Sequence, residues 1–173
     1  MLSLSQSSLP TFERSLTALL AVLEKAETHA KARNFDPTNY LALRLAPDMF
    51  PLARQVQTCC DHAKNGSSRL AGVAAPVFED NEATFAELRA RVARTLEVLG
   101  ALDRKAVDAG AEREIVFSAG PNKLKMRGDD YLVHFVLPNF YFHLVTAYGI
   151  LRAAGVEIGK LDFLGAVPRV TPA

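Results

Sequence analysis

The sequence predicts an all-α protein built as a four-helix bundle, with one small β-hairpin inserted before the last helix. Four segments repeat apolar residues every three or four positions, which is the period of a helix that buries one face. One further segment, residues 112–127, alternates apolar with mostly charged residues, which is the period of a strand. The 173 residues suffice for one domain with a hydrophobic core, and we treat residues 1–173 as that domain.

Composition and charge exclude several classes of protein. The chain is 49% hydrophobic and 23% charged, close to the average of globular proteins. Its net charge is +1, and it lacks the clustered basic residues of a nucleic-acid-binding protein. No uncharged apolar run reaches the roughly 18 residues that cross a membrane, and the N-terminal residues do not resemble a secretory signal. We therefore expect a cytoplasmic protein that binds neither nucleic acid nor membrane.

The first helix is predicted over residues 3–33. Ser3 and Gln6 have the spacing of a capping box, and leucines and alanines repeat along one face of the helix. Pro10 either bends this helix or marks its true start, because a helix tolerates proline only in its first turn. His29 lies near the C-terminal end, where a cation suits the helix dipole, and we expect it at the surface.

The second helix is predicted over residues 48–70, with Asp48 as its N-cap. It follows a turn or short helical piece that Asp36 and Pro37 begin around Tyr40. Its inward stripe has regular helical spacing and is formed by Leu52, Val56, Cys59, Ala63 and Leu70.

The two cysteines, Cys59 and Cys60, are adjacent in this second helix. Neighbouring side chains on a helix point in different directions, so a disulfide between the two would be strained. We expect reduced, buried thiols, while a metal-binding or redox role stays an alternative.

The third helix is predicted over residues 80–102, with Asp80 as its N-cap and Gly100 near its end. Its inward residues are Phe85, Leu88, Val92, Leu96 and Leu99.

The hairpin of residues 112–127 presents one apolar and one largely charged face. A lone hairpin is marginal in water, so we expect its apolar face to pack on the helices.

The fourth helix is predicted over residues 129–154, and it is the most apolar and aromatic segment of the chain. Pro138 lies in its interior, removes one backbone hydrogen bond and should bend it. Gly155 ends it, and the tail of residues 156–173 has no periodicity. We expect this tail to cross the surface of the bundle.

His143 is the main candidate for a functional residue, because it lies in the middle of an otherwise apolar stripe of the fourth helix. Asn139 lies one turn before it, so both side chains reach the same patch. His62 on the second helix faces the edge of its inward stripe, and Tyr40 and Tyr148 complete the polar residues expected to line a central pocket. His143 is either a core histidine that is hydrogen-bonded to a neighbour or a ligand-binding residue.

Several stretches resemble a known family. They are RLAPDMFPLARQVQ (residues 44–57), ATFAELRARV (residues 83–92), DYLVHFVLPNFYFHLVTAYGILRAAGV (residues 130–156) and IGKLDFLG (residues 158–165). They are similar to a bacterial domain-of-unknown-function family of the DinB/YfiT-like superfamily of four-helix bundles. The resemblance implies this fold and a metal site with one histidine from the second helix and a His-x-x-x-His pair from the last. Some members are thiol-dependent transferases or isomerases.

The metal pattern of that superfamily is incomplete in this chain. If His143 begins the pair, its partner position holds Ala147; if it ends the pair, the partner position holds Asn139. Alanine cannot bind a metal, and asparagine is a weak oxygen ligand. His62 and His143 would therefore supply only two ligands to a divalent ion such as zinc or nickel, and a catalytic zinc takes three.

These observations leave two hypotheses for function. The first is a small-molecule-binding or otherwise non-catalytic protein that uses the pocket near His143 without a metal. The alternative is a metal-dependent, thiol S-transferase-like enzyme that uses His62, His143 and a third ligand of another kind. We also predict a homodimer, because the side chains of residues 140–142 are aromatic and point in three directions, more than one chain can bury.

Overall fold

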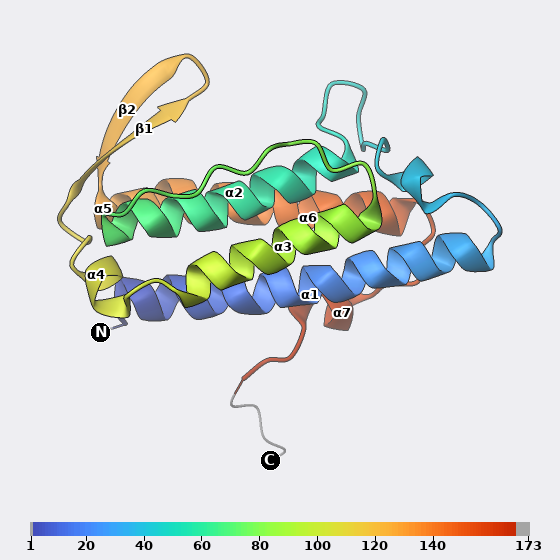
Figure 1. Cartoon of the computed structure of the whole chain (residues 1–173), viewed down its shortest axis with the longest axis horizontal. Helices are drawn as coiled ribbons and strands as arrows, with labels where there is room; N and C mark the ends of the chain where they lie inside the picture. The colour runs from blue at the N-terminus through green and yellow to red at the C-terminus, as the bar shows by residue number, and fades with distance from the viewer. Residues whose placement is uncertain (1, 169–173) are drawn as a thin grey trace.

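The computed structural model describes residues 2–168, and four long helices lie side by side in it (Figure 1). These are α1 (Leu4–Ala32), α2 (Leu52–Ala71), α3 (Phe85–Gly100) and α6 (Leu137–Ala153). The shorter elements are η1 (Pro37–Tyr40), α4 (Arg104–Asp108), α5 (Gly128–Asp130), η2 (Tyr131–Val136) and α7 (Lys160–Leu164). The predicted all-α bundle is confirmed, and so is its single hairpin, formed by β1 (Glu114–Ala119) and β2 (Asn122–Arg127).

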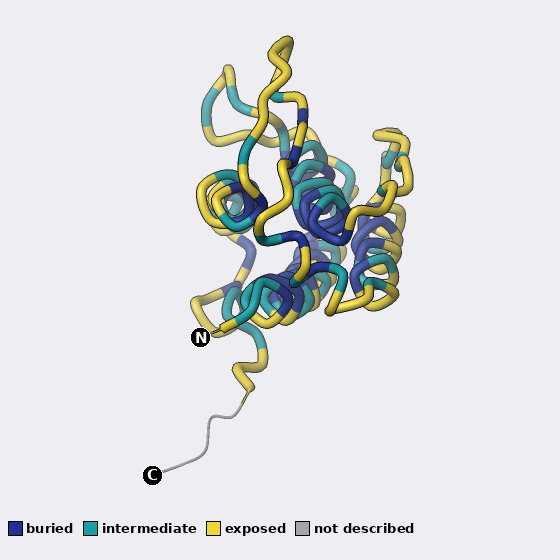
Figure 2. The backbone as a smooth tube through the Cα atoms, turned by 90° about the vertical axis from the view of Figure 1, so that its left-hand side faces the viewer, coloured by how far each residue is buried: buried dark blue, intermediate teal, exposed yellow. Residues whose placement is uncertain are grey.

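The core lies between the four long helices, whose inward faces are buried (Figure 2). Every long helix contributes side chains that are wholly inaccessible to solvent, among them Leu16, Val56, Leu88 and Phe140. The inward stripe predicted for α2 is confirmed, and so is that of α3 except for Leu96, which is half-buried. Helix α3 also buries Arg91 and Thr95, which the apolar pattern did not predict. Helical period alone therefore placed most of the core.

Two helix starts differ from the prediction, because other groups take the place of the expected caps. Asp48 does not cap α2; the backbone N–H of Leu52, its first residue, donates instead to the carbonyl of Leu43 at 2.8 Å. Asp80 does not cap α3 either. That helix begins at Phe85, where the side chain of Thr84 accepts from the backbone N–H of Glu87. In α1, by contrast, the predicted capping box between Ser3 and Gln6 is confirmed, and Pro10 lies inside the helix.

The predicted fourth helix is interrupted before Pro138, where η2 forms a stretch of π-helix between α5 and α6. Because Pro138 has no N–H, the carbonyl of His134 has no helical donor four residues later. The wider turn of a π-helix accommodates this gap. At the junction, the side-chain Nδ2 of Asn139 donates to the carbonyl of Phe135 at 2.7 Å. The irregularity therefore lies in the turn before Pro138, and Pro138 itself occupies the first turn of α6.

The hairpin pairs β1 with β2 in antiparallel register, with Phe117 opposite Leu124. It extends away from the helices in Figure 1. Its apolar side is anchored at the base, where the ring of Phe117 lies 4.8 Å from that of Tyr131 and 4.5 Å from that of Phe135. On the other side Lys125 pairs with Glu114 at 2.9 Å, so part of the basic row is neutralised within the hairpin.

The tail is more regular than expected, because it contains the short helix α7. This helix packs on α1 through an ion pair of Lys25 with Asp162 at 2.7 Å and a hydrogen bond from Arg14 to the carbonyl of Leu164 at 3.0 Å. Residues 169–173 of the predicted tail lie outside the described residues. Over residues 2–168, no helix is long and apolar enough to span a membrane.

Candidate functional site

His143 faces α2 from the middle of α6, with only 8% of its surface exposed. Its Nδ1 lies 2.7 Å from Oε1 of Gln55, a buried residue of the first turn of α2. The amide of Gln55 is itself oriented, because its Nε2 donates to the carbonyl of Phe50 at 3.0 Å. The oxygen of Gln55 must therefore accept, so Nδ1 of His143 carries the proton and Nε2 keeps a free lone pair.

His62 lies at the edge of the α2 stripe and turns inward, beside His143. The two imidazole rings are nearly parallel, with centroids 5.6 Å apart and an interplanar angle of 12°. Phe50 stacks on His143 at 6.3 Å, and Phe135 meets His62 edge-on at 5.7 Å. The pair is thus held within a row of aromatic side chains from the loop before α2, from α2, from η2 and from α6.

Both imidazoles are uncharged at neutral pH. Burial lowers the pKa of His62 to about 4, and the neighbouring His143 contributes to this shift. Burial also lowers the pKa of His143, with a further contribution from the positive charge of Arg54. An uncharged imidazole offers one lone pair, which accepts a hydrogen bond or binds a metal.

The free nitrogens of the pair reach solvent. Within residues 2–168, the buried side-chain polar atoms without a partner are His29 Nε2, Ser67 Oγ, Ser68 Oγ and Arg91 Nε. Nε2 of His143 and both nitrogens of His62 form no hydrogen bond there, yet they are not among these atoms. They are therefore not completely shielded from solvent, although the rings that carry them are largely buried.

The other predicted pocket residues are not all near this pair. Asn139 lies one turn before His143, and its side-chain amide donates a hydrogen bond to the carbonyl of Phe135. Tyr40 packs against Phe35, at a ring distance of 5.2 Å, and binds His29 instead. Tyr148 packs against Phe163 at 5.6 Å, on α7. The structure therefore brings His62 and His143 together, while the contacts of Tyr40 and Tyr148 lie elsewhere.

Gln55 and Phe50 are site residues that the sequence analysis missed. Gln55 precedes His62 by two helical turns and so lies on the same face of α2, which was a usable signal. Phe50 lies in the irregular loop before α2, and no local pattern predicts where its ring goes. Its backbone is joined to α2 by the hydrogen bond that its carbonyl accepts from Gln55.

The pair does not form a complete metal site. A catalytic zinc takes three protein ligands and keeps one open position. No cluster of three histidine, cysteine, aspartate or glutamate side chains with suitable geometry occurs in the described part of the chain. His62 and His143 supply two imidazoles, and Ala147, one turn beyond His143, supplies none. The residues present therefore do not fit a resident catalytic metal ion.

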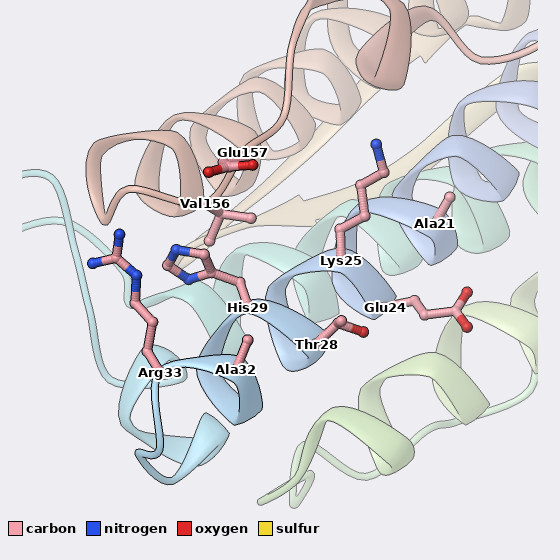
Figure 3. Close-up of a pocket in the computed structure, with 9 residues that line it drawn as sticks. All are labelled: Ala21, Glu24, Lys25, Thr28, His29, Ala32, Arg33, Val156 and Glu157. Carbon is pink, nitrogen blue, oxygen red and sulfur yellow. The ribbon is translucent and has the colours of Figure 1, made fainter.

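A second feature is a groove of about 650 Å³ along the C-terminal half of α1 (Figure 3). It is lined by His29, Arg33 and Val156 among others, and contains neither His62 nor His143. The prediction that His29 is a surface residue holds only in part: His29 is half-buried, its Nδ1 is bound to the hydroxyl of Tyr40 at 2.6 Å, and its Nε2 is buried. The lining residues of the groove come from α1 and from the segment after α6, as Figure 3 shows, and they include no second histidine.

A third feature is the fully buried guanidinium of Arg91. It binds Asp61 at 3.0 Å, Asp80 at 2.9 Å and Glu82 at 3.0 Å. Asp80 and Glu82 belong to the segment between α2 and α3, so Arg91 fastens this segment to the bundle. Its charge is satisfied by these carboxylates, which indicates a structural role.

Comparisons with known proteins agree with this fold. The family described as domain of unknown function DUF1993 matches residues 4–164. A crystal structure of a DinB family member from Shewanella denitrificans is 41% identical, with a TM-score of 0.87; the match covers 98% of this chain and 96% of that one. No protein of curated function matches the sequence.

Proposed function

Because the chain belongs to the DUF1993 family of DinB-like proteins, we propose that it binds a small molecule at the His62–His143 pair without a resident metal ion. The observation that carries this proposal is the hydrogen bond from Nδ1 of His143 to Gln55. It fixes one tautomer of the imidazole and leaves the lone pair of Nε2 without a partner in the protein. Such a fixed acceptor, set among aromatic rings, is typical of ligand sites with a few oriented polar groups.

The chemistry of the pair indicates which ligands fit. His143 is uncharged, and its free nitrogen accepts, so it favours a ligand that donates a hydrogen bond. The neighbouring rings of Phe50 and His62 favour a planar group beside that donor. Anions are disfavoured at this position, because the lone pair of Nε2 would meet another negative centre.

Phenol tests this proposal, with anisole as a control. Both molecules are planar and neutral, but only phenol has a hydroxyl that donates to Nε2 of His143. We expect millimolar phenol to shift the ¹⁵N resonance of that nitrogen, and anisole to leave it unchanged. The variant His143→Phe keeps an aromatic ring, and in it the ¹⁵N resonances of the neighbouring His62 should no longer respond to phenol. Equal responses to phenol and anisole would contradict a hydrogen-bonding site.

Metal analysis of untagged protein tests the metal-dependent alternative. Zinc and nickel are added separately, and bound metal is measured after dialysis. With only two imidazole ligands we expect binding well below one ion per chain. Stoichiometric zinc or nickel that is lost in His143→Phe would overturn the metal-free proposal and favour the S-transferase-like enzyme.

The homodimer and the cytoplasmic location predicted from the sequence stay proposals. Support for the homodimer comes from α6, which exposes 56% of Phe142 and 51% of Val145 although both side chains are apolar. Support for the location comes from Cys59 and Cys60, which are buried free thiols and suit a reducing compartment.

A further inference from the structure

Three polar side chains of α2 lie in one line along the helix. Gln55, His62 and Arg69 follow one another at intervals of seven residues, or two helical turns, so they share one face of α2. Gln55 orients His143, and His62 stacks on it. Arg69 belongs to the same face, but its charge has no part in the site described above.

Arg69 is a half-buried cation without a counter-charge. Within residues 2–168, its one side-chain hydrogen bond goes from Nη1 to the hydroxyl of Tyr131 at 2.9 Å, and no carboxylate lies within ion-pair distance of it. Arg54, Arg89 and Arg91, by contrast, each contact a carboxylate. A partly buried charge has lost part of its hydration, so an anion that approaches Arg69 is favoured.

The bond to Tyr131 leaves one edge of the guanidinium free. Nε and Nη2 of Arg69 donate no hydrogen bond within residues 2–168, yet neither is among the buried atoms without a partner. Both nitrogens are therefore not completely shielded from solvent. Together they form the edge that binds a carboxylate through two parallel N–H···O bonds.

Aromatic rings connect Arg69 with the histidine pair. The ring of Tyr131, whose hydroxyl binds Arg69, is nearly parallel to that of Phe135, with centroids 5.7 Å apart. Phe135 in turn meets His62 at 5.7 Å, and both of these residues are half-buried, so a molecule beside them contacts flat rings. Burial is the main cause of the lowered pKa of His62, and the positive charge of Arg69 adds to it. The guanidinium therefore lies close enough to act on the pair.

We propose that Arg69 binds a carboxylate of the same molecule whose hydrogen-bond donor contacts Nε2 of His143. The ligand is then an elongated molecule with a hydroxyl or N–H group at one end, a planar middle part and a carboxylate at the other end. Positions 62 and 69 are about 10 Å apart along the helix axis, which sets the scale of its length. The anion lies at Arg69 and not at Nε2, where the lone pair would repel it. This inference rests on the proposed function, because it names the class of ligand for that site.

An acid and its methyl ester test the inference. The probe para-hydroxyphenylpropionate carries a phenol hydroxyl and, on a flexible arm, a carboxylate; the methyl ester has the same ring and hydroxyl without the charge. We expect calorimetric titration to show that wild type binds the acid about tenfold more tightly than the ester, because the acid alone forms charge-assisted hydrogen bonds with Arg69.

Three variants show whether Arg69 causes this preference. Arg69→Gln removes the charge but keeps a donor for the hydroxyl of Tyr131, so we expect acid and ester to bind it equally. Arg69→Lys keeps the charge without the fork of donors and should retain only part of the preference, which covers the case in which Arg69→Gln is unstable. Lys123→Gln removes an exposed cation of the hairpin and should keep the full preference, which separates a local contact from an effect of net charge.

The outcomes distinguish this inference from the proposed function. Equal binding of acid and ester by wild type, or a full preference for the acid in either Arg69 variant, would overturn the role of Arg69 alone. Ester binding by Arg69→Gln at the affinity of wild type would show that the variant keeps the rest of the site. If wild type bound neither phenol nor the two probes, both the proposed function and this inference would be wrong.

Discussion

Gln55 decides which nitrogen of His143 carries the proton. A neutral imidazole has two tautomers, and the partner of one nitrogen selects between them. Here that partner is an amide oxygen, held by the hydrogen bond from Gln55 to the carbonyl of Phe50. At the scale of single residues, the site therefore depends on a side chain that does not face the ligand at all.

Replacing Gln55 should change the tautomer before it changes the fold. In Gln55→Leu, Nδ1 of His143 loses its acceptor, and we expect a cost of about 1–3 kcal/mol in unfolding free energy because a buried donor is left unpaired. Imidazole ¹⁵N spectra should then show a mixture of tautomers. Gln55→Glu is the matched variant: its carboxylate should keep the Nδ1–H tautomer and raise the pKa of His143. A single unchanged tautomer in Gln55→Leu would contradict the proposed role.

Acid should destabilise the protein through the histidine pair. Burial lowers the pKa of His62 to about 4, whereas the unfolded chain titrates near the ordinary value of about 6.5. The unfolded state therefore binds the proton first. The stabilisation is complete above about pH 6.5 and is lost as the pH falls toward 4, by roughly 3 kcal/mol for a shift of this size.

Urea unfolding between pH 7 and pH 5 measures this effect. The carboxyl groups of Asp108 and Asp162 also have lowered pKa values, but they lose their contribution only at lower pH, near their ordinary values. His62→Gln should flatten the dependence above pH 5, and His143 should account for most of what remains. An unchanged slope in His62→Gln would show that His62 does not titrate as the buried geometry requires.

At the scale of elements, the segment between α2 and α3 is held by charge rather than by apolar packing. Asp80 and Glu82 bind the buried guanidinium of Arg91, and the ring of Phe78 lies under the cations of Lys64 and Arg94 at 4.7 and 4.2 Å. A segment without helix or strand needs such partners, because its backbone makes few hydrogen bonds of its own.

Arg91→Met should release this segment. It leaves the buried carboxylate of Glu82 without its cation, and removal of one partner of a buried ion pair costs about 3–5 kcal/mol. Hydrogen exchange of residues 72–84 should rise well before that of α2. Arg89→Met is the control: Arg89 pairs with Glu27 at a partly exposed position, where an ion pair contributes at most about 1 kcal/mol. Equal losses in the two variants would contradict the fastening role of Arg91.

At the scale of the whole molecule, the two cysteines report on cooperative unfolding. Cys59 and Cys60 are fully buried in α2, and burial raises the pKa of Cys60 to about 12. The reactive species of a thiol is the thiolate. Neither cysteine should therefore be reactive in the folded bundle, whether toward metals, oxidants or alkylating reagents.

Thiol labelling checks this expectation. In native buffer at pH 8, we expect Cys59 and Cys60 to react with a disulfide reagent only at the rate of global unfolding. Ser118→Cys on the exposed side of the hairpin supplies the control, since its added thiol should react at once. Rapid labelling of either natural cysteine would indicate local opening of α2. It would then favour the alternative hypothesis that the adjacent cysteines have a redox role.

The sequence by itself determined the four helices, the hairpin and most of the core. These features follow from periods of 3.6 and 2 residues, which are properties of neighbouring positions along the chain. The stripe of Leu52, Val56 and Cys59 was therefore predicted and is buried. His62 and His143 were also found in this way, because a polar residue stands out within an apolar stripe.

Only the tertiary structure decided which side chains meet. Gln55 and His143 are 88 positions apart, and their contact depends on how α2 and α6 are set against each other by packing. In the same way, Asp80 binds Arg91 instead of capping a helix, and Tyr40 binds His29 instead of lining the site. Local patterns predict that a residue will be buried, or that a buried polar residue will need a hydrogen-bond partner. They do not encode its partner, because the free energy that selects the partner belongs to contacts between helices and not to either helix alone.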